Sequence, residues 1–258
     1  MISALRLLSA GALAAFVAFP LFADTLPDPA TKSQVPPVTF VQARISTKLN
    51  FADFILTGRV HSDKTHKSYP LTLRAKGHVL VYEFTDQPLQ LRVNLGGKDG
   101  SGVFSLEKRT SSSGTWSTVP TSQYTQPVLD TDITYGDLVL DFINWDDIQP
   151  LGTDTIKTLP SYVFDAHPGA NDHSQFPTIR FWVSKEYWAF LRIDGLNAKG
   201  QTAKRVEVQN VMTIADKYTV FKEMKVSYMA PDKDDIATST TYIDIDDGKE
   251  GSGLTDSK

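Results

Sequence analysis

Along most of the chain hydrophobic residues alternate with polar ones, the pattern of β-strands that bury one face. In residues 69–77, for example, Leu71, Leu73 and Ala75 take every second position and polar residues fill the others. Segments that we interpret as strands, with turn-forming residues between them, lie at 53–60, 69–77, 78–85, 87–95, 102–108, 159–168, 177–184, 186–194, 196–211, 216–229 and 238–246. Of these, 78–85 is apolar on both faces, and 196–211 contains a turn at Lys199-Gly200. About ten strands with few helices predict a mainly β fold, an antiparallel barrel or strongly curved sheet.

Two stretches depart from the period of two. Residues 39–50 place their apolar side chains near a helical stripe and predict a short first helix. Residues 110–134 are rich in Ser and Thr and predict a long surface loop. Residues 131–148 then place Thr134 before Asp137, an arrangement typical of a helix N-terminus. We interpret this segment as one short amphipathic helix.

The first residues have the pattern of a signal peptide. Arg6 precedes an apolar stretch at 7–23, and Ala23 stands before the first acidic residue. We therefore expect residues 1–23 to be a signal peptide cleaved near Ala23, and the mature protein to work in the periplasm. The alternative is a membrane anchor, but the stretch is slightly shorter than the roughly 20 residues that span a bilayer.

The rest of the chain divides by composition. Residues 24–38 hold four prolines and predict a Pro-rich linker. Residues 39–247 are expected to form a single β domain, and residues 248–258 a flexible tail.

Composition narrows the classes of function. The chain has no Cys, which excludes disulfides, thiolate metal ligands and a lipidated cysteine. Its net charge is -4, and no basic tract stands out. Nucleic acid is therefore not expected as a partner, because phosphate binding needs clustered Lys and Arg. Contact with a membrane would be peripheral.

Motifs of known catalytic sites are missing. No G-x-S-x-G, H-E-x-x-H or phosphate-binding loop occurs in the sequence. The best metal candidate is the set Asp165, His167, Asp172 and His173, but it lacks the spacing of known zinc sites and also fits a polar loop. We expect no metal, no cofactor and no catalytic residues.

The segment DITYGDLVLDFINW resembles one found in LolA-like outer-membrane lipoprotein-sorting proteins. The residues that carry the resemblance are Thr134, Tyr135, Asp137, Leu138, Phe142, Ile143 and Trp145. The order of strands after this segment, up to STTYIDI near residue 245, is also similar. The layout is alike over roughly residues 53–247, and the motifs only over 134–245.

The resemblance implies a half-open antiparallel β-barrel with a few short helices covering its mouth. It also implies a non-enzymatic carrier or receptor that binds the acyl chains of lipoproteins or a similar lipid for envelope sorting. Residues 136–147 are then a candidate for a movable cover. We expect the apolar cavity to be lined by Phe54, Leu56, Leu71, Leu73, Leu89, Leu91, Val93, Phe142, Trp145, Phe181 and Val183.

Two other functions remain open at this point. One is a secreted hydrolase that uses carboxylates such as Asp165 or Asp194. The other is a structural interaction module of the envelope. Cavity volume separates the interaction module from the carrier, because an interior filled tightly by side chains argues against lipid carriage. The hydrolase instead predicts a cleft with paired carboxyl groups of perturbed pKa. The identity of the ligand, the loading and acceptor proteins and the oligomeric state do not follow from the sequence.

Overall fold

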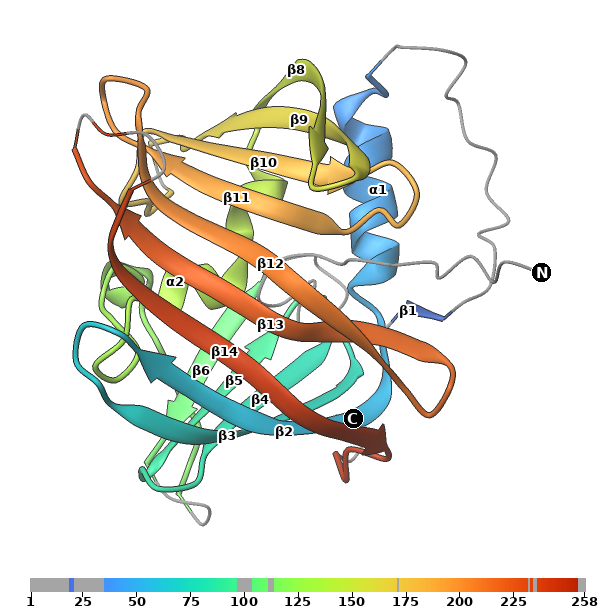
Figure 1. Cartoon of the computed structure of the whole chain (residues 1–258), viewed down its shortest axis with the longest axis vertical. Helices are drawn as coiled ribbons and strands as arrows, with labels where there is room; N and C mark the ends of the chain where they lie inside the picture. Colours follow the sequence, from blue (N-terminus) through green and yellow to red (C-terminus); the bar gives the residue numbers. More distant parts are fainter. Residues whose placement is uncertain are drawn as a thin grey trace.

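The computed structural model describes residues 19–20, 35–96, 104–110, 114–170, 172–231, 233 and 236–254. Most of these residues lie in strands, and helical turns are few (Figure 1). The helical elements are α1 (Val38–Lys48), η1 (Thr121–Gln123), α2 (Tyr135–Val139) and η2 (Asp141–Asn144). The strands are β1 (Phe19–Pro20), β2 (Phe51–Ser62), β3 (Ser68–Gly77), β4 (Val79–Phe84), β5 (Leu89–Asn94), β6 (Ser105–Arg109), β7 (Ser117–Thr118), β8 (Asp147–Ile156), β9 (Leu159–His167), β10 (Thr178–Ser184), β11 (Phe190–Leu196), β12 (Thr202–Ile214), β13 (Tyr218–Met229) and β14 (Ala237–Glu250).

The strands form one antiparallel, strongly curved sheet. Its order is β7-β6-β5-β4-β3-β2-β14-β13-β12-β11-β10-β9-β8, with β1 paired to β13 outside this path. No pairing joins β7 to β8 in the described chain, so the sheet curls without closing (Figure 1). The expected half-open antiparallel barrel with few helices is confirmed.

The predicted alternation decides which face of each strand is buried. In β3, Leu71, Leu73 and Ala75 are buried and their neighbours are not. On the far side of the sheet, Phe181 and Val183 of β10 point into the same large cluster. Trp182, between them, packs instead in a small cluster on the opposite face with Leu191.

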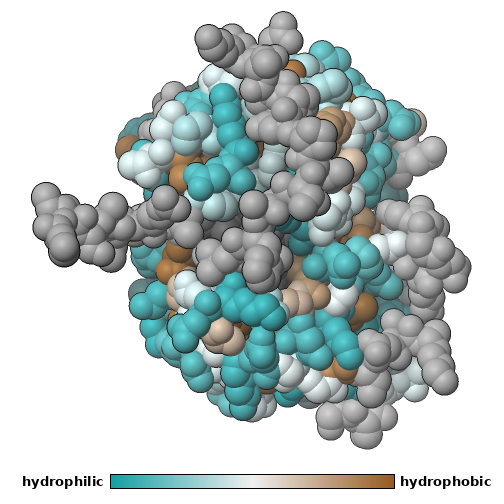
Figure 2. Space-filling view, turned by 90° about the vertical axis from the view of Figure 1, so that its right-hand side faces the viewer, coloured by the Kyte–Doolittle hydropathy of each residue, from teal (hydrophilic) through white to brown (hydrophobic). Residues whose placement is uncertain are grey.

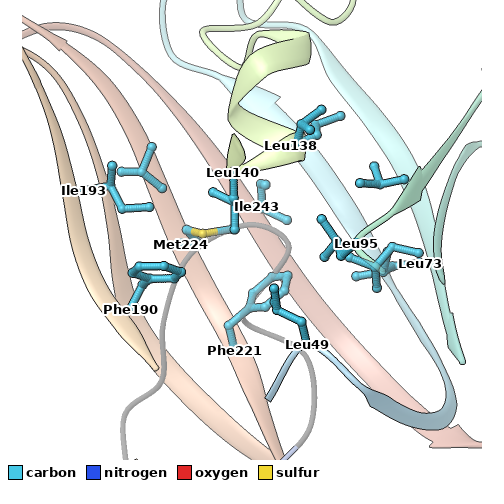
Figure 3. Packing of buried hydrophobic residues seen from close by; sticks show 14 of the residues in the cluster. Leu49, Leu73, Leu95, Leu138, Leu140, Phe190, Ile193, Phe221, Met224 and Ile243 are labelled. Atoms are coloured by element: carbon cyan, nitrogen blue, oxygen red, sulfur yellow. The ribbon is translucent and has the colours of Figure 1, made fainter. Parts of the chain in front are cut away.

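The helical elements lie on the concave side of the sheet. Val41 and Ile45 of α1 are buried in the large cluster. α2 contacts β5 and β6, whereas η2 contacts β9. Leu138 and Leu140 of this region are buried in the large cluster, and Figure 3 shows them among its side chains.

Two sequence expectations are corrected here. The segment 131–148 is not one helix, because Leu140 takes a left-handed backbone conformation (φ 55°) that separates α2 from η2, and β8 begins at Asp147. The tail does not begin at 248, because β14 runs to Glu250 and Ser252 is fully buried. Sequence alternation missed β8 because most of its residues are exposed at the edge of the sheet.

The expected signal peptide and most of the expected linker lie outside the described residues, apart from the backbone of β1. Within the described residues, no helix has the length and apolar character to cross a membrane. On the face of the molecule beside α1, hydrophilic residues predominate and hydrophobic ones are scattered (Figure 2). Among the described residues, the large hydrophobic side chains that are exposed are Leu151 and Ile236.

Candidate ligand pocket beside the α2–η2 segment

The α2–η2 segment, residues 135–144, spans the concave side of the sheet from β5 and β6 to β9. Short polar contacts hold its two ends. Asp132, just before α2, accepts hydrogen bonds from Ser239 (2.7 Å) and Thr241 (2.9 Å) of β14. At the other end the side chain of Gln42 in α1 donates to the carbonyl oxygen of Ile143 (2.8 Å). The segment is thus tied to the sheet and to the first helix.

A pocket of about 80 Å³ lies beside this segment. Its lining comes from the α2–η2 segment, the loop before β10, and strands β10 to β12. The lining residues are Tyr124, Thr125, Thr134, Gly136, Asp137, Leu140, Asp141, Phe142, Trp145, His173, Ser174, Gln175, Phe176, Ile179, Ile193, Gly195, Lys204 and Val206. The apolar side chains outnumber the charged ones, and the charged ones have distinct roles.

Asp137 and Lys204 form an ion pair in the pocket wall. The Nζ of Lys204 lies 2.5 Å from Oδ2 of Asp137, and their side chains are only 3% and 16% exposed. The backbone N–H and the hydroxyl of Thr134 donate to the same oxygen at 2.6 and 2.8 Å. Asp137 therefore caps α2, as its sequence position predicts, and also binds α2 to β12.

Asp141 is a second carboxyl in the pocket wall. Its pKa is raised to about 6, mainly by burial and also by the nearby charge of Asp172, whereas backbone hydrogen bonds and His173 act in the opposite direction. Within the described chain no Lys or Arg forms an ion pair with Asp141, whose hydrogen bonds come from the backbone of Asp141 and Phe142. A largely buried carboxyl with this environment marks a candidate binding site.

Aromatic rings surround the carboxyl. Phe142 makes an edge contact with Trp145, at 6.4 Å between ring centroids, and contacts Phe181 and Phe190 at 5.3 and 5.7 Å. Trp145 is 6% exposed, and its buried Nε1–H has no hydrogen-bond acceptor among the described residues. Phe142 is thus the side chain that joins the pocket to the aromatic part of the interior.

The cavity residues expected from sequence lie together in the interior. Ten of the eleven are buried in the large cluster, and Leu89 packs at its margin, half-buried. Only Phe142 and Trp145 also line the pocket of about 80 Å³. Phe181 lines a second gap of about 10 Å³, enclosed by α1, η2 and the start of β8. In this conformation the interior is therefore occupied mostly by the protein's own side chains.

Sequence reasoning named Thr134, Asp137 and His173 in other roles and missed Lys204, Asp141 and Tyr124 as pocket residues. Lys204 sits at a position where β12 turns its side chain inward, and an inward charge in an alternating strand is a visible signal. Phe176 lies over the backbone of Gly195, where a Cβ would come within 2.3 Å of its ring. Asp141 and Tyr124 stand in segments without periodicity, so only the fold brings them together.

The carboxylates considered for hydrolysis are held by arginines. Asp165 of β9 accepts two hydrogen bonds from Arg180 of β10, at 2.8 and 2.9 Å. Asp194 of β11 accepts two from Arg205 of β12, at 2.9 and 2.8 Å. Such bidentate pairs between neighbouring strands are typical of sheet stabilisation.

The metal candidate does not assemble in the described residues. Asp165 is paired with Arg180, and the carboxylate of Asp172 accepts the backbone N–H of Gly169 at 2.7 Å. Across the described part of the chain, no three His, Asp or Glu side chains gather as ligands.

Comparison with known proteins places the chain in a family. Residues 111–257 match a family model whose description is "Uncharacterized protein". The chain belongs to that family. No curated protein matches the sequence. The matched region includes every residue of the pocket lining named above.

Solved structures share the fold of the chain. A DUF1329 family protein from Desulfovibrio piger superposes with a TM-score of 0.62 at 17% identity, over 86% of this chain and 96% of that one. A protein from Vibrio parahaemolyticus, described as an outer membrane lipoprotein-sorting protein domain, gives 0.58 at 15% identity, over 83% and 93%. A LolA superfamily protein from Nitrosomonas europaea gives 0.50 at 13%, over 87% and 96%. The likeness to LolA-like proteins that the sequence predicts is thus confirmed as a likeness of fold.

Proposed function

We propose that the chain is a non-enzymatic carrier or receptor for acylated ligands, lipoproteins or lipids, in the periplasm. Two observations support this. The fold is shared with a domain described as lipoprotein-sorting. The concave interior is lined by apolar and aromatic side chains, and Phe142 joins it directly to a pocket at the surface. The second observation carries the proposal, because an acyl chain needs an apolar interior with an entrance.

Binding requires the α2–η2 segment to move. A pocket of about 80 Å³ is smaller than the roughly 300–1,000 Å³ of sites that enclose small ligands. Leu138 and Leu140 fill the space between the two sides of the curved sheet (Figure 3). When they leave, an acyl chain takes their place, and each buried CH₂ contributes about 0.8 kcal/mol. Because the acyl chain replaces side chains that are also apolar, the ligand can be both loaded and released.

The polar ties of the segment suit this exchange. The contacts of Asp132 and Asp137 lie at its first end, and that of Gln42 lies at the other. Opening breaks these side-chain contacts, and in the open state the groups that made them form hydrogen bonds with water instead. Contact with a membrane or with a membrane protein that supplies the ligand is peripheral in this proposal.

A truncation of the segment tests the proposal. Leu138→Ala removes part of the side chains that occupy the interior. It is expected to lower the free energy of unfolding by about 3 kcal/mol, as for other buried leucines. It is also expected to raise the affinity for a fluorescent acyl chain of 12 to 16 carbons several-fold, because the ligand displaces less protein. Fluorescence titration of the purified protein measures the affinity.

Leu191→Ala is the matched control. Leu191 is as buried as Leu138 (2% exposed each) but packs on the opposite face of the sheet with Trp182. It is expected to lose similar stability and to leave acyl affinity unchanged. Acyl binding that is absent in wild type and in both variants, together with a clean apo mass in native mass spectrometry, overturns the carrier and favours an interaction module.

A further inference from the structure

The pocket beside the α2–η2 segment contains charged and hydrogen-bonding groups, which an acyl chain alone does not need. Its wall contains an ion pair that is complete, between Asp137 and Lys204. It also contains the Asp141 carboxyl, which forms no ion pair with a Lys or Arg within the described chain, and the buried Nε1–H of Trp145, which has no acceptor among the described residues. Buried charges and buried donors in proteins are normally paired, and an unpaired one costs folding free energy. Both groups border the same cavity.

The surroundings of Asp141 favour a cation. Tyr124, Phe142, Trp145 and Phe176 line the cavity with it. Aromatic faces attract an ammonium through their quadrupoles, and the attraction is stronger when water is excluded. A carboxylate among such rings is an arrangement suited to alkylated ammonium groups, whereas it repels an anionic head.

The size of the cavity fits a head group. Its volume of about 80 Å³ is several times the roughly 10–15 Å³ that one water requires. It therefore admits a group of a few heavy atoms and no long chain. Phe142 lies between this cavity and the rings of Phe181 and Phe190, so a tail attached to the head continues directly into the interior.

We propose that this cavity binds the head of an amphiphilic ligand that carries an ammonium group beside an oxygen acceptor. Asp141 is the counter-ion of the ammonium, and the Nε1–H of Trp145 donates to the ester, amide or phosphate oxygen. This assignment rests on the proposed function for the tail of the ligand. It adds the class of head group, which neither the fold nor the apolar interior specifies.

The test compares probes that share the same dodecyl chain and differ in their head group. Dodecyltrimethylammonium and dodecyl sulfate, both below their micelle concentrations, are titrated by calorimetry at pH 7.5 into the mature protein and into Asp141→Asn. The ammonium probe is expected to bind wild type at least tenfold more tightly than the sulfate. Asp141→Asn is expected to bind the ammonium probe at least fivefold more weakly than wild type does, and to bind the sulfate probe with unchanged affinity. Equal affinities for both probes, unchanged in the variant, overturn the head-group assignment and leave the carrier intact.

The role of Trp145 has its own variant. Trp145→Phe keeps an aromatic ring and removes the N–H. It is expected to weaken the binding of dodecylphosphocholine several-fold. The binding of dodecyltrimethylammonium, which has no oxygen, is expected to stay unchanged. Loss of both probes alike contradicts the hydrogen bond.

A probe that consists of the head group alone, without an acyl tail, separates the head-group proposal from the carrier proposal. Tetramethylammonium is expected to bind in the millimolar range, and Asp141→Asn to abolish that binding. If it binds while no dodecyl probe does, the head pocket stands and the carrier fails. If it does not bind wild type and the ammonium and sulfate dodecyl probes bind equally, the head pocket fails.

Discussion

Lys204 of β12 and Asp137 of α2 lie 2.5 Å apart, in an ion pair that is almost fully removed from solvent. The pair joins the middle of the sheet to the short helix that enters its concave side. Because Asp137 also accepts two hydrogen bonds from Thr134, the same carboxylate shapes the helix and anchors it.

Removal of the lysine is expected to be costly. Lys204→Met leaves the carboxylate of Asp137 buried without its cation, so the free energy of unfolding is expected to fall by about 3 kcal/mol. The double variant Lys204→Met with Asp137→Asn is expected to recover part of the loss, because no charge is left unpaired. Urea unfolding of the single and double variants measures the coupling. Additive losses contradict a coupled pair.

The stability of the protein is expected to depend on pH through Asp141. Its folded-state pKa of about 6 lies above the ordinary aspartate value of 3.8, so folding favours the neutral carboxyl. This contribution is fully present below about pH 4 and is lost as the pH rises through about 6. At 1.4 kcal/mol for each pH unit the loss amounts to about 3 kcal/mol.

Asp141→Asn removes this titration. Relative to wild type, the variant is expected to gain stability between pH 4 and pH 8, as measured by urea unfolding at both values. Parallel pH profiles for the two proteins count against a buried, uncompensated carboxyl.

The junction of β2 and β14 is expected to tolerate no side chain at Gly58. A Cβ there would lie 1.9 Å from the carbonyl oxygen of Asp244, which is backbone and has no room to move. Gly58→Ala is expected to destabilise by about 3 kcal/mol or more, through forced separation of the strands. Thermal unfolding measures it.

Gly200→Ala is the control for that change. Gly200 has a φ of +78° in an open turn with no atom within 4 Å of a Cβ. Only backbone strain applies there, about 1–2 kcal/mol. A smaller loss at Gly58 than at Gly200 would mean that the two strands are not in close contact.

The end of β14 is expected to contribute to stability through Ser252. Its backbone N–H and hydroxyl donate to Oδ1 of Asp53 at 2.6 and 2.5 Å, and these bonds lower the pKa of Asp53. Ser252→Ala is expected to cost about 1 kcal/mol at neutral pH. The effect is expected to vanish as the pH falls and Asp53 gains a proton, because the ionised carboxylate accepts the bonds. Lys249→Ala, at an exposed position nearby, is expected to leave unfolding unchanged in the same urea titrations.

Periodicity predicted the sheet well because each strand buries one face. The alternation in 69–77 recurs as buried Leu71 and Leu73 in β3. By contrast β8 was missed, because a strand at an exposed edge needs no hydrophobic face. The break at Leu140 was also missed, since nothing local marks a leucine with a positive φ, and its burial in the core stabilises that conformation.

The sequence by itself determined the mainly β class, the capping of α2 by Asp137 and the apolar interior, because these follow from period and from residue chemistry. Only the tertiary structure decided that Tyr124, Asp141 and Lys204 border one cavity, and that Asp165 belongs to Arg180. The physical reason is distance along the chain. Curvature of the sheet brings the loop before β10 and strand β12 against the α2–η2 segment, and no local pattern encodes that meeting.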